Sequence, residues 1–541
     1  MKKIYFLIFP LLLAVLGINY GLPMHLVGDE ESLVGGAIKM IELKRFFPVL
    51  NPDQFKILYY PPIIPYLYVL TSLPIIIFKF FVSGFDVLAL KDYFILNLDG
   101  IWISARLTSS IFSLGVLVVV YKLTELIFSK KAAYLATILL ALSFFHVLLS
   151  HQARHWIFTV FFAYLTILLT ILLVKGRLKK YWLIGLTAGI ALGTTYVTAL
   201  GVGLAFLILF FYRHQISQPY KKIGINIFLA LSIGTSLILI NLPDLLRFKY
   251  GGKLVGEPLQ KSFTGLLSQL EQVITILFNQ EFIIFLLAVL ALLLWKRNFK
   301  IKIFMASFAF LYFVVLYYFL HFEARYTYFI IPALAILAAD TLVVLSEKIK
   351  YKKLYYFILS LLFLWPALGA INYTRLILAD DTRELAIQYI SQEIGDQEFL
   401  LSSPTIYLPR TDKSLVIAEN YGHINTVERY TYNHYDRLVA NFDKTYNYQN
   451  IHFWSDDFKN PIALDEYIQK YQPSYFVLEY WFEEDLKDYY SSLRQKAVLV
   501  KILRQSNLPE NYDINGNFWV FNSVLFDLER LGPSIAIYKL K

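Results

Sequence analysis

Long apolar stretches separated by short polar connections occupy the first two thirds of this chain. Eleven of them approach the length of about 20 apolar residues that a helix needs to cross a bilayer. They are residues 4–22, 101–128, 132–150, 156–174, 181–196, 198–213, 223–241, 274–295, 301–320, 326–346 and 353–372. The pattern predicts a mainly α-helical membrane protein with about eleven transmembrane helices.

A further apolar run, residues 61–82, is also long enough to cross, but it carries four prolines. Lys and Arg gather in the cytoplasmic connections of membrane proteins, so their placement tests whether this run crosses. Five basic connections fall on the side of the amino-terminal Lys2 and Lys3 only if the run does not cross. These connections are residues 130–131, 175–180, 213–222, 296–302 and 348–353. The sequence therefore predicts a cytoplasmic N-terminus, with residues 61–82 lying along or dipping into the outer leaflet of a cell membrane.

Residues 23–99 form the first outer loop in this topology. Residues 32–47 have an amphipathic pattern that is typical of an interfacial helix. Residues 83–99 contain three aspartates and one lysine, which suits the outer face of the membrane. We therefore expect interfacial helices within this loop.

The composition changes near residue 372, where the apolar spans end and polar, Tyr- and Asp-rich sequence begins. The chain thus divides into a transmembrane domain, residues 1–372, and an extracytoplasmic domain, residues 373–541. Local patterns in the second domain predict two helices and three short strands, hence a small α/β fold. The helices are residues 381–394 and 486–504, and the strands are residues 399–401, 475–478 and 535–538.

The overall composition restricts the class of protein. With 57% hydrophobic residues and a mean hydropathy of +0.54, the chain is too apolar for a soluble globule of this length. The net charge of +10 is explained by the cytoplasmic connections, so we do not expect a nucleic-acid partner. The absence of cysteine excludes disulfides, thiol catalysis and cysteine-bound metals.

Charged residues at the outer ends of the spans are the candidate site. Asp29 and Glu30 follow the first span, and Arg106, Arg154 and Arg325 lie near the outer ends of later ones. Guanidinium groups bind phosphate in pairs of hydrogen bonds, and a carboxylate can deprotonate a hydroxyl. Together they suit a phosphate-bearing substrate. The alternative is structural: Asp29 would cap the following helix, and each arginine would anchor its helix at lipid phosphates.

Six short motifs follow one another along the chain. They are Gly28-Asp29-Glu30, Tyr59-Tyr60-Pro61-Pro62, Arg106, Ser150-His151-Gln152-Ala153-Arg154, Arg325-Tyr326 with Pro332, and Asp381 to Ala386. In this order they resemble the motifs of the protein O-mannosyltransferases and aminoarabinose transferases. These are integral-membrane glycosyltransferases of the GT-C type, similar to bacterial family 39 proteins. The resemblance covers roughly residues 1–390.

The resemblance implies a GT-C-like helix bundle and a specific reaction. A sugar would pass, with inversion, from a polyprenyl-phosphate donor to a lipid, glycan or protein acceptor at the outer face. Asp29, with Glu30 beside it, would be the base in the first outer loop. Arg106 would brace that loop or the donor phosphate, and Arg154 and Arg325 would hold the leaving phosphate. The residues proposed as accessory are Tyr60, His155, His321 and Glu323.

Departures from the family pattern leave the donor and any metal role open. Tyr60 stands where many relatives have His or Lys, and His155 follows Arg154 where many have Asp. The histidines near Arg154 lack the helical ligand spacing of a metal site, so no cofactor is assigned, and a divalent cation is left open. Two other classes also stay open: a polyprenyl-lipid flippase or transporter, and a catalytically inactive glycan-binding membrane protein.

Overall fold

The computed structural model describes most of the chain. The described residues are 7–22, 26–28, 30–55, 58, 60–195, 198–241, 262–294, 298–319, 323–403, 406, 408–411, 413–414, 444–450, 468–481, 493, 495–507, 511–512 and 524–541. Two units can be distinguished. The first unit comprises Met1–Ile18, Asp29–Leu73 and Ile101–Asn372, and the second unit comprises Asn19–Gly28, Pro74–Gly100 and Tyr373–Lys541. The second unit thus includes two segments that the sequence analysis placed in the transmembrane domain.

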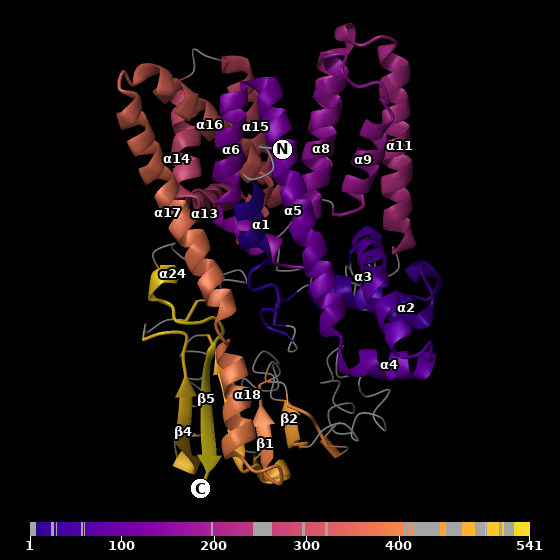
Figure 1. Ribbon diagram of the computed structural model, residues 1–541, viewed down its shortest axis with the longest axis vertical. Coiled ribbons are helices and arrows are strands. Elements are labelled where there is room, and N and C mark those ends of the chain that lie inside the picture. Colours follow the sequence, from indigo (N-terminus) through magenta and orange to yellow (C-terminus); the bar gives the residue numbers. More distant parts are fainter. Residues whose placement is uncertain are drawn as a thin grey trace. The chain divides into compact units, whose positions relative to one another are not determined.

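Helices form most of the first unit (Figure 1). Each predicted span contains at least one helix, as the apolar pattern requires. In chain order they are α1 (Ile8–Val15), α5 (Asp99–Ile127), α6 (Lys130–Ala141), α7 (Phe144–Ser150), α8 (Trp156–Val174), α9 (Leu183–Leu192), α10 (Ala199–Phe211), α11 (Pro219–Ile240), α13 (Phe263–Gln280), α14 (Phe282–Leu293), α15 (Phe299–Phe319), α16 (Ile331–Lys348) and α17 (Lys352–Leu378).

Several of these helices have the length and composition of membrane spans. Among the described residues, six helices qualify, or up to eight if each bent pair counts as one span. The chain is therefore a multi-pass membrane protein. The count of eleven spans and the orientation of the termini stay predictions.

Helices also form in the described part of residues 23–99, the predicted first outer loop. They are η2, a π-helix (Glu31–Gly35), α2 (Gly36–Leu43), the 3₁₀ turns η3 (Pro48–Leu50) and η4 (Pro52–Phe55), α3 (Ile63–Val82) and α4 (Val87–Leu96). The amphipathic pattern of residues 32–47 matches η2 and α2. Helix α3 is long and apolar enough to span a membrane, so its predicted interfacial position stays a prediction.

Two predicted spans are bent, which corrects the sequence analysis. Residues 274–295 were expected to form one helix, but the helix breaks at Glu281 and α13 and α14 meet at 116°. Residues 132–150 likewise divide into α6 and α7, bent by 62°. Ser143 begins α7 by accepting a hydrogen bond from the backbone N–H of His146. A polar residue that caps or breaks a helix inside an apolar run is not visible in hydropathy alone.

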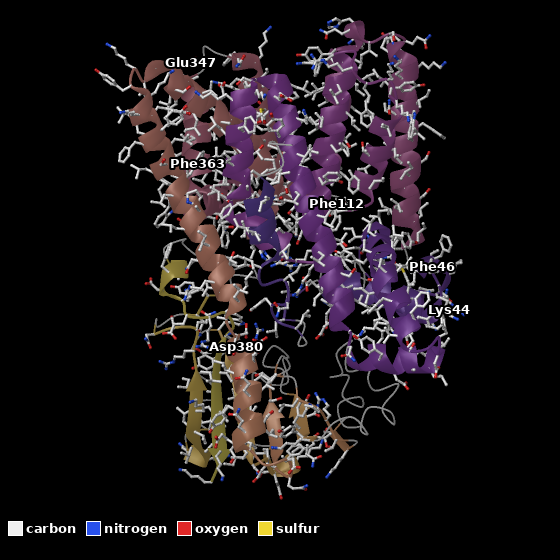
Figure 2. All side chains as sticks on the ribbon, in the orientation of Figure 1. Lys44, Phe46, Phe112, Glu347, Phe363 and Asp380 are labelled. Carbon is white, nitrogen blue, oxygen red and sulfur yellow. The ribbon has the colours of Figure 1, made fainter. Side chains whose placement is uncertain are left out.

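Close packing joins the helices of the first unit. Helix α9 lies against α8 and α11, and α16 lies against α6 and α14 (Figure 1). Phe112 lies on α5 (Figure 2). Its ring centroid is 4.7 Å from that of Phe158 and 5.0 Å from that of Phe161, both on α8. Such ring pairs stabilise beyond the area that they bury.

The second unit contains a mixed five-stranded sheet of order β2-β1-β3-β5-β4. Its strands are β1 (Phe399–Ser402), β2 (Asn447–Asn450), β3 (Tyr475–Tyr480), β4 (Ala497–Leu503) and β5 (Ser534–Leu540). β1 pairs in parallel with β2 and β3, while β5 is antiparallel to β3 and β4. Helix α18 (Thr382–Glu393) buries Ala386 and Ile390 against the sheet, and a short helix, α24 (Val524–Asp527), precedes β5.

Three strands and one helix of this domain were predicted correctly: β1, β3, β5 and α18. The helix predicted at residues 486–504 is wrong over residues 497–503, which form β4, while residues 486–492 and 494 lie outside the described residues. This segment alternates β-branched Val498, Val500 and Ile502 with other residues, which favours a strand over a helix.

Candidate active site

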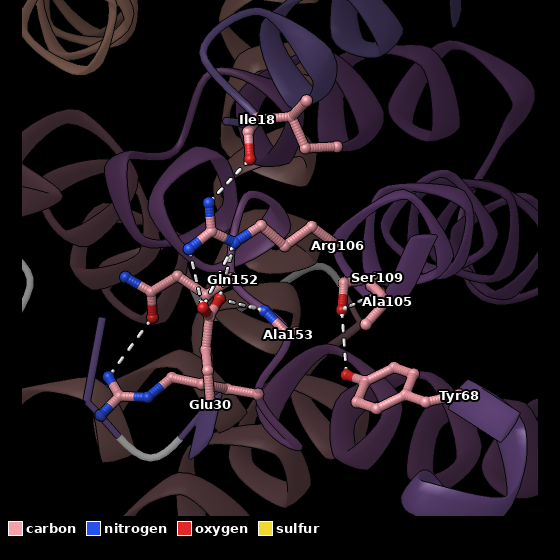
Figure 3. A network of polar contacts seen from close by, with 9 residues as sticks. Ile18, Glu30, Tyr68, Ala105, Arg106, Ser109, Gln152 and Ala153 are labelled. Carbon is pink, nitrogen blue, oxygen red and sulfur yellow. Dashed lines mark hydrogen bonds and ion pairs between the residues drawn. The ribbon is translucent and has the colours of Figure 1, made fainter. Parts of the chain in front are cut away.

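A buried ion pair joins Glu30, at the start of η2, to Arg106 on α5 (Figure 3). Arg106 donates from Nε to Glu30 Oε1 at 3.0 Å and from Nη2 to Glu30 Oε2 at 2.7 Å. Its Nη1 donates to the carbonyl of Ile18 at 2.7 Å. Glu30 is 0% exposed and Arg106 is 1% exposed. A buried charge is tolerated when it is paired and hydrogen-bonded, as both charges are here. This ion pair therefore holds the start of η2 against α5.

The same carboxylate binds the segment that follows α7. The backbone N–H of Ala153 donates to Glu30 Oε1 at 2.6 Å. The next residue, Arg154, is buried and donates from Nη1 to Gln152 Oε1 at 3.3 Å. Glu30 therefore links two of the predicted motifs directly, and Arg106 joins the third.

Ring contacts extend this cluster to two other motifs. The centroid of the His155 ring lies 4.6 Å from the centroid of the Tyr60 ring. The neighbouring Trp156 packs its ring 4.9 Å from that of Tyr326. Tyr326 belongs to the 3₁₀ helix η7 (Ala324–Phe329), which also carries Arg325. The segment after α7 thus contacts the outer-loop motif on one side and η7 on the other.

Arg325 forms an ion pair with Glu323, so a predicted phosphate-binding residue and a predicted accessory residue contact each other. Glu323 is buried, whereas Arg325 keeps part of its surface exposed. A partly exposed guanidinium beside a buried carboxylate can exchange partners with an incoming phosphate.

Polar groups outside the predicted motifs hold these segments in place. Asn241, at the end of α11, donates from Nδ2 to the carbonyls of Leu58 and Tyr60 at 2.8 and 2.9 Å.

The hydroxyl of Ser143 donates to Glu281 Oε1 at 2.5 Å, and the backbone N–H of Phe145 donates to the same oxygen at 3.1 Å. The carboxylate at the α13–α14 break therefore binds the N-terminus of α7.

The middle of α7 is fixed as well. His146 Nδ1 lies 2.8 Å from the hydroxyl of Tyr328 on η7. Helix α7 leads directly into Ala153 and Arg154, so its position determines theirs. Glu281 and His146 were missed from the sequence, because their partners are distant in the chain and neither lies in a recognisable motif.

Two predicted residues, Asp29 and His321, lie outside the described residues. The structure brings together Glu30, Arg106 and the Arg154 segment, and it places Tyr60 and Arg325 on elements that contact that segment through rings. Among the residues that the structure describes, no group of three or more His, Asp or Glu side chains is arranged to hold a metal ion.

Part of the chain matches a known protein family. The family model of the dolichyl-phosphate-mannose-protein mannosyltransferases matches residues 96–237. The resemblance predicted from the sequence is confirmed. The matched segment includes Arg106 and Arg154 and runs from α5 to α11, which is less than half of the chain. The chain is thus similar to membrane glycosyltransferases of the GT-C type.

Solved structures give similarities at low sequence identity. ArnT from Cupriavidus metallidurans in the apo state aligns over 99% of this chain and 97% of its own, with 12% identity and a TM-score of 0.47. The same protein bound to undecaprenyl phosphate aligns over 99% and 98%, with 11% identity and a TM-score of 0.45. The Archaeoglobus fulgidus oligosaccharyltransferase in the apo form aligns over 88% of this chain and 70% of its own, with 12% identity and a TM-score of 0.47. No curated protein matches the chain in sequence. Because these TM-scores are below 0.5, no residue role is transferred from the structures.

Proposed function

We propose that this chain is an inverting membrane glycosyltransferase that moves a sugar from a polyprenyl-phosphate donor to an acceptor at the extracytoplasmic face. The acceptor is a lipid, a glycan or a protein hydroxyl. In this proposal the N-terminus is cytoplasmic, and residues 373–541 form an extracytoplasmic domain. The match of residues 96–237 to a mannosyltransferase family supports the class of reaction.

The observation that carries the proposal is the burial of Glu30 between Arg106 and the backbone of Ala153. This contact joins the acidic motif of the first outer loop to two arginine motifs in the first unit. A transfer centre needs a base and an anion-binding group held near each other, because orientation supplies much of the rate. Asp29, the proposed base, immediately precedes Glu30 in the chain.

Each residue then has a chemical role. Asp29 accepts the proton of the acceptor hydroxyl as that oxygen attacks the anomeric carbon of the sugar. The bond from that carbon to the phosphate oxygen breaks, and polyprenyl phosphate leaves with the electron pair. Arg154 and Arg325 neutralise the leaving phosphate. Glu30 and Arg106, which are hydrogen-bonded to each other, hold the loop that carries Asp29.

A transfer assay on the full chain in lipid nanodiscs tests the proposal. Dolichyl-phosphate mannose and undecaprenyl-phosphate mannose, both radiolabelled, are supplied with membranes of the expression host as a source of acceptors. We expect free polyprenyl phosphate and acceptor-linked mannose to form in equal amounts. Folded protein that releases no sugar from either donor in nanodiscs, but moves the lipid across the bilayer of sealed proteoliposomes, would overturn it.

One observation favours the transporter alternative. Lys302 on α15 and Asp340 on α16 form a 2.8 Å ion pair, and each side chain is 1% exposed. Ionisable groups inside membrane helices often mark transport pathways. The double variant Lys302→Met/Asp340→Leu separates the two functions: a transporter should stop moving a fluorescent polyprenyl phosphate, whereas a glycosyltransferase should keep its sugar transfer.

A further inference from the structure

A buried hydrogen-bond network in the second unit joins the segment after α1 to the start of α18. The hydroxyl of Tyr20 donates to Asp381 Oδ2 at 2.5 Å, across 361 residues of chain. Arg383 donates to both oxygens of the same carboxylate, from Nε at 2.8 Å and from Nη2 at 3.0 Å. Asp381 is 0% exposed and Tyr20 is 8% exposed. Hydrogen bonds to a carboxylate that is paired with a guanidinium are of the stronger, charge-assisted kind.

The Asp381 carboxylate is fixed by its own domain before Tyr20 is considered. It caps α18 by accepting a hydrogen bond from the backbone N–H of Arg383, and the Asp381 N–H donates to Glu384 Oε2, which completes a capping box. The neighbouring Gly532 has a φ of +103°, and a Cβ there would lie 2.3 Å from Asp381 Oδ1. The C-terminal domain therefore presents this carboxylate in one position, and only glycine fits beside it.

Tyr20 stands at the start of a turn that leads toward Asp29. The N–H of Leu26 donates to the carbonyl of Gly21 at 3.2 Å and closes the turn. Gly21 has a φ of +69°, which favours glycine. Val27 is 3% exposed. Asp29 follows two residues later in the chain.

We propose that Tyr20 is a positioning residue, through which the C-terminal domain holds residues 20–22 and 26–28, the described part of the segment that precedes Asp29 in the chain. The inference rests on the proposed function for the role of Asp29, but the anchoring of the turn by Asp381 does not depend on it. In this proposal the C-terminal domain contributes to catalysis, although none of its residues lies at the reacting atoms.

Hydrogen–deuterium exchange of the full chain tests the anchor directly. Tyr20→Phe removes only the hydroxyl. The matched control is Tyr448→Phe, which removes a buried hydroxyl that donates to the Leu408 carbonyl at 2.7 Å in the same unit. We expect exchange in a peptide covering residues 20–30 to rise by about tenfold in Tyr20→Phe only, as the loss of a hydrogen bond to a charged group implies. Equal exchange in the two variants, or a rise spread over the whole chain, would overturn the anchor.

A double-mutant cycle tests the link to catalysis. Tyr20→Phe, Asp381→Asn and their combination are assayed for turnover of the polyprenyl-phosphate mannose that the parent chain uses, per folded protein. If Tyr20 acts through Asp381, the combined loss should equal the larger single loss, whereas additive losses would refute the positioning role. If the parent chain transfers no sugar, the proposed function fails, and the exchange measurement still decides whether Asp381 anchors residues 20–28.

Discussion

The Arg106 guanidinium meets the Glu30 carboxylate at 2.7 to 3.2 Å, and neither residue is more than 1% exposed. A charge buried in this way depends on its partner, because it cannot regain water when the partner is removed. The pair also joins two segments separated by 76 residues of chain. The structure of the outer loop and the function of Asp29 should therefore respond together to changes at this pair.

Arg106→Met should destabilise the fold by about 3–5 kcal/mol, because it leaves the Glu30 carboxylate buried without a partner. Thermal or denaturant unfolding of the protein in detergent measures this. Arg45→Met, at an exposed arginine of the same loop, should change stability by less than about 0.5 kcal/mol. The double variant Glu30→Gln/Arg106→Met should regain much of the stability but not the sugar transfer. A single variant as stable as the control would contradict the importance of the pair.

Glu281→Ala should destabilise the protein by about 1–3 kcal/mol, because the Ser143 hydroxyl and the Phe145 N–H lose their acceptor. Transfer should also fall, since α7 leads into Arg154. Glu281→Gln keeps an oxygen acceptor and should lose less on both measures. Glu271→Ala, at an exposed carboxylate on α13, is the control. Equal behaviour of Glu281→Ala and the control would refute a positioning role for α7.

Arg154→Lys and Arg325→Lys should each weaken binding of undecaprenyl phosphate by about tenfold, because lysine cannot make the paired hydrogen bonds of a guanidinium. Calorimetric titration of the protein in detergent with this lipid measures the affinity. Arg45→Lys serves as the control for a general loss of positive charge. Unchanged affinity in both variants would remove these arginines from the donor site.

Gly185→Ala and Gly189→Ala should each cost about 1–3 kcal/mol, because the added methyl group meets close-packed atoms of α11. A Cβ at position 185 would lie 2.7 Å from the Asn226 carbonyl oxygen, and one at 189 would lie 2.6 Å from Ile233 Cβ. Gly203→Ala on α10 meets nothing within 4 Å and should be neutral. Unfolding curves of the three variants test these expectations. Equal stability of all three variants would show that α9 and α11 can separate without cost.

The apolar pattern predicted the helices well, because each long run must satisfy its own backbone hydrogen bonds in lipid. It missed the break at Glu281, since the partner that makes a buried carboxylate tolerable there, Ser143, is 138 residues away. The strand at Val498 was also missed, although its alternating β-branched residues favour a strand, and its only described neighbour in the sheet is the next strand, β5.

The candidate site was predictable in part. Glu30 and Arg106 were recognised as charges that an apolar environment permits only with partners. The Ala153 N–H was not predictable, because a backbone donor leaves no mark on the sequence. The Trp156–Tyr326 contact was not predictable either, because aromatic residues are common throughout this chain.

The measurement that tests the central proposal most directly is mannose transfer by Asp29→Asn, compared with Glu42→Gln as a matched carboxylate change on α2 of the same loop. Both proteins are assayed in nanodiscs at equal folded concentration with dolichyl-phosphate mannose and undecaprenyl-phosphate mannose. We expect Glu42→Gln to keep the parent rate and Asp29→Asn to lose about 10²–10⁴-fold, the usual contribution of a general base. Transfer by Asp29→Asn at the parent rate would contradict Asp29 as the base.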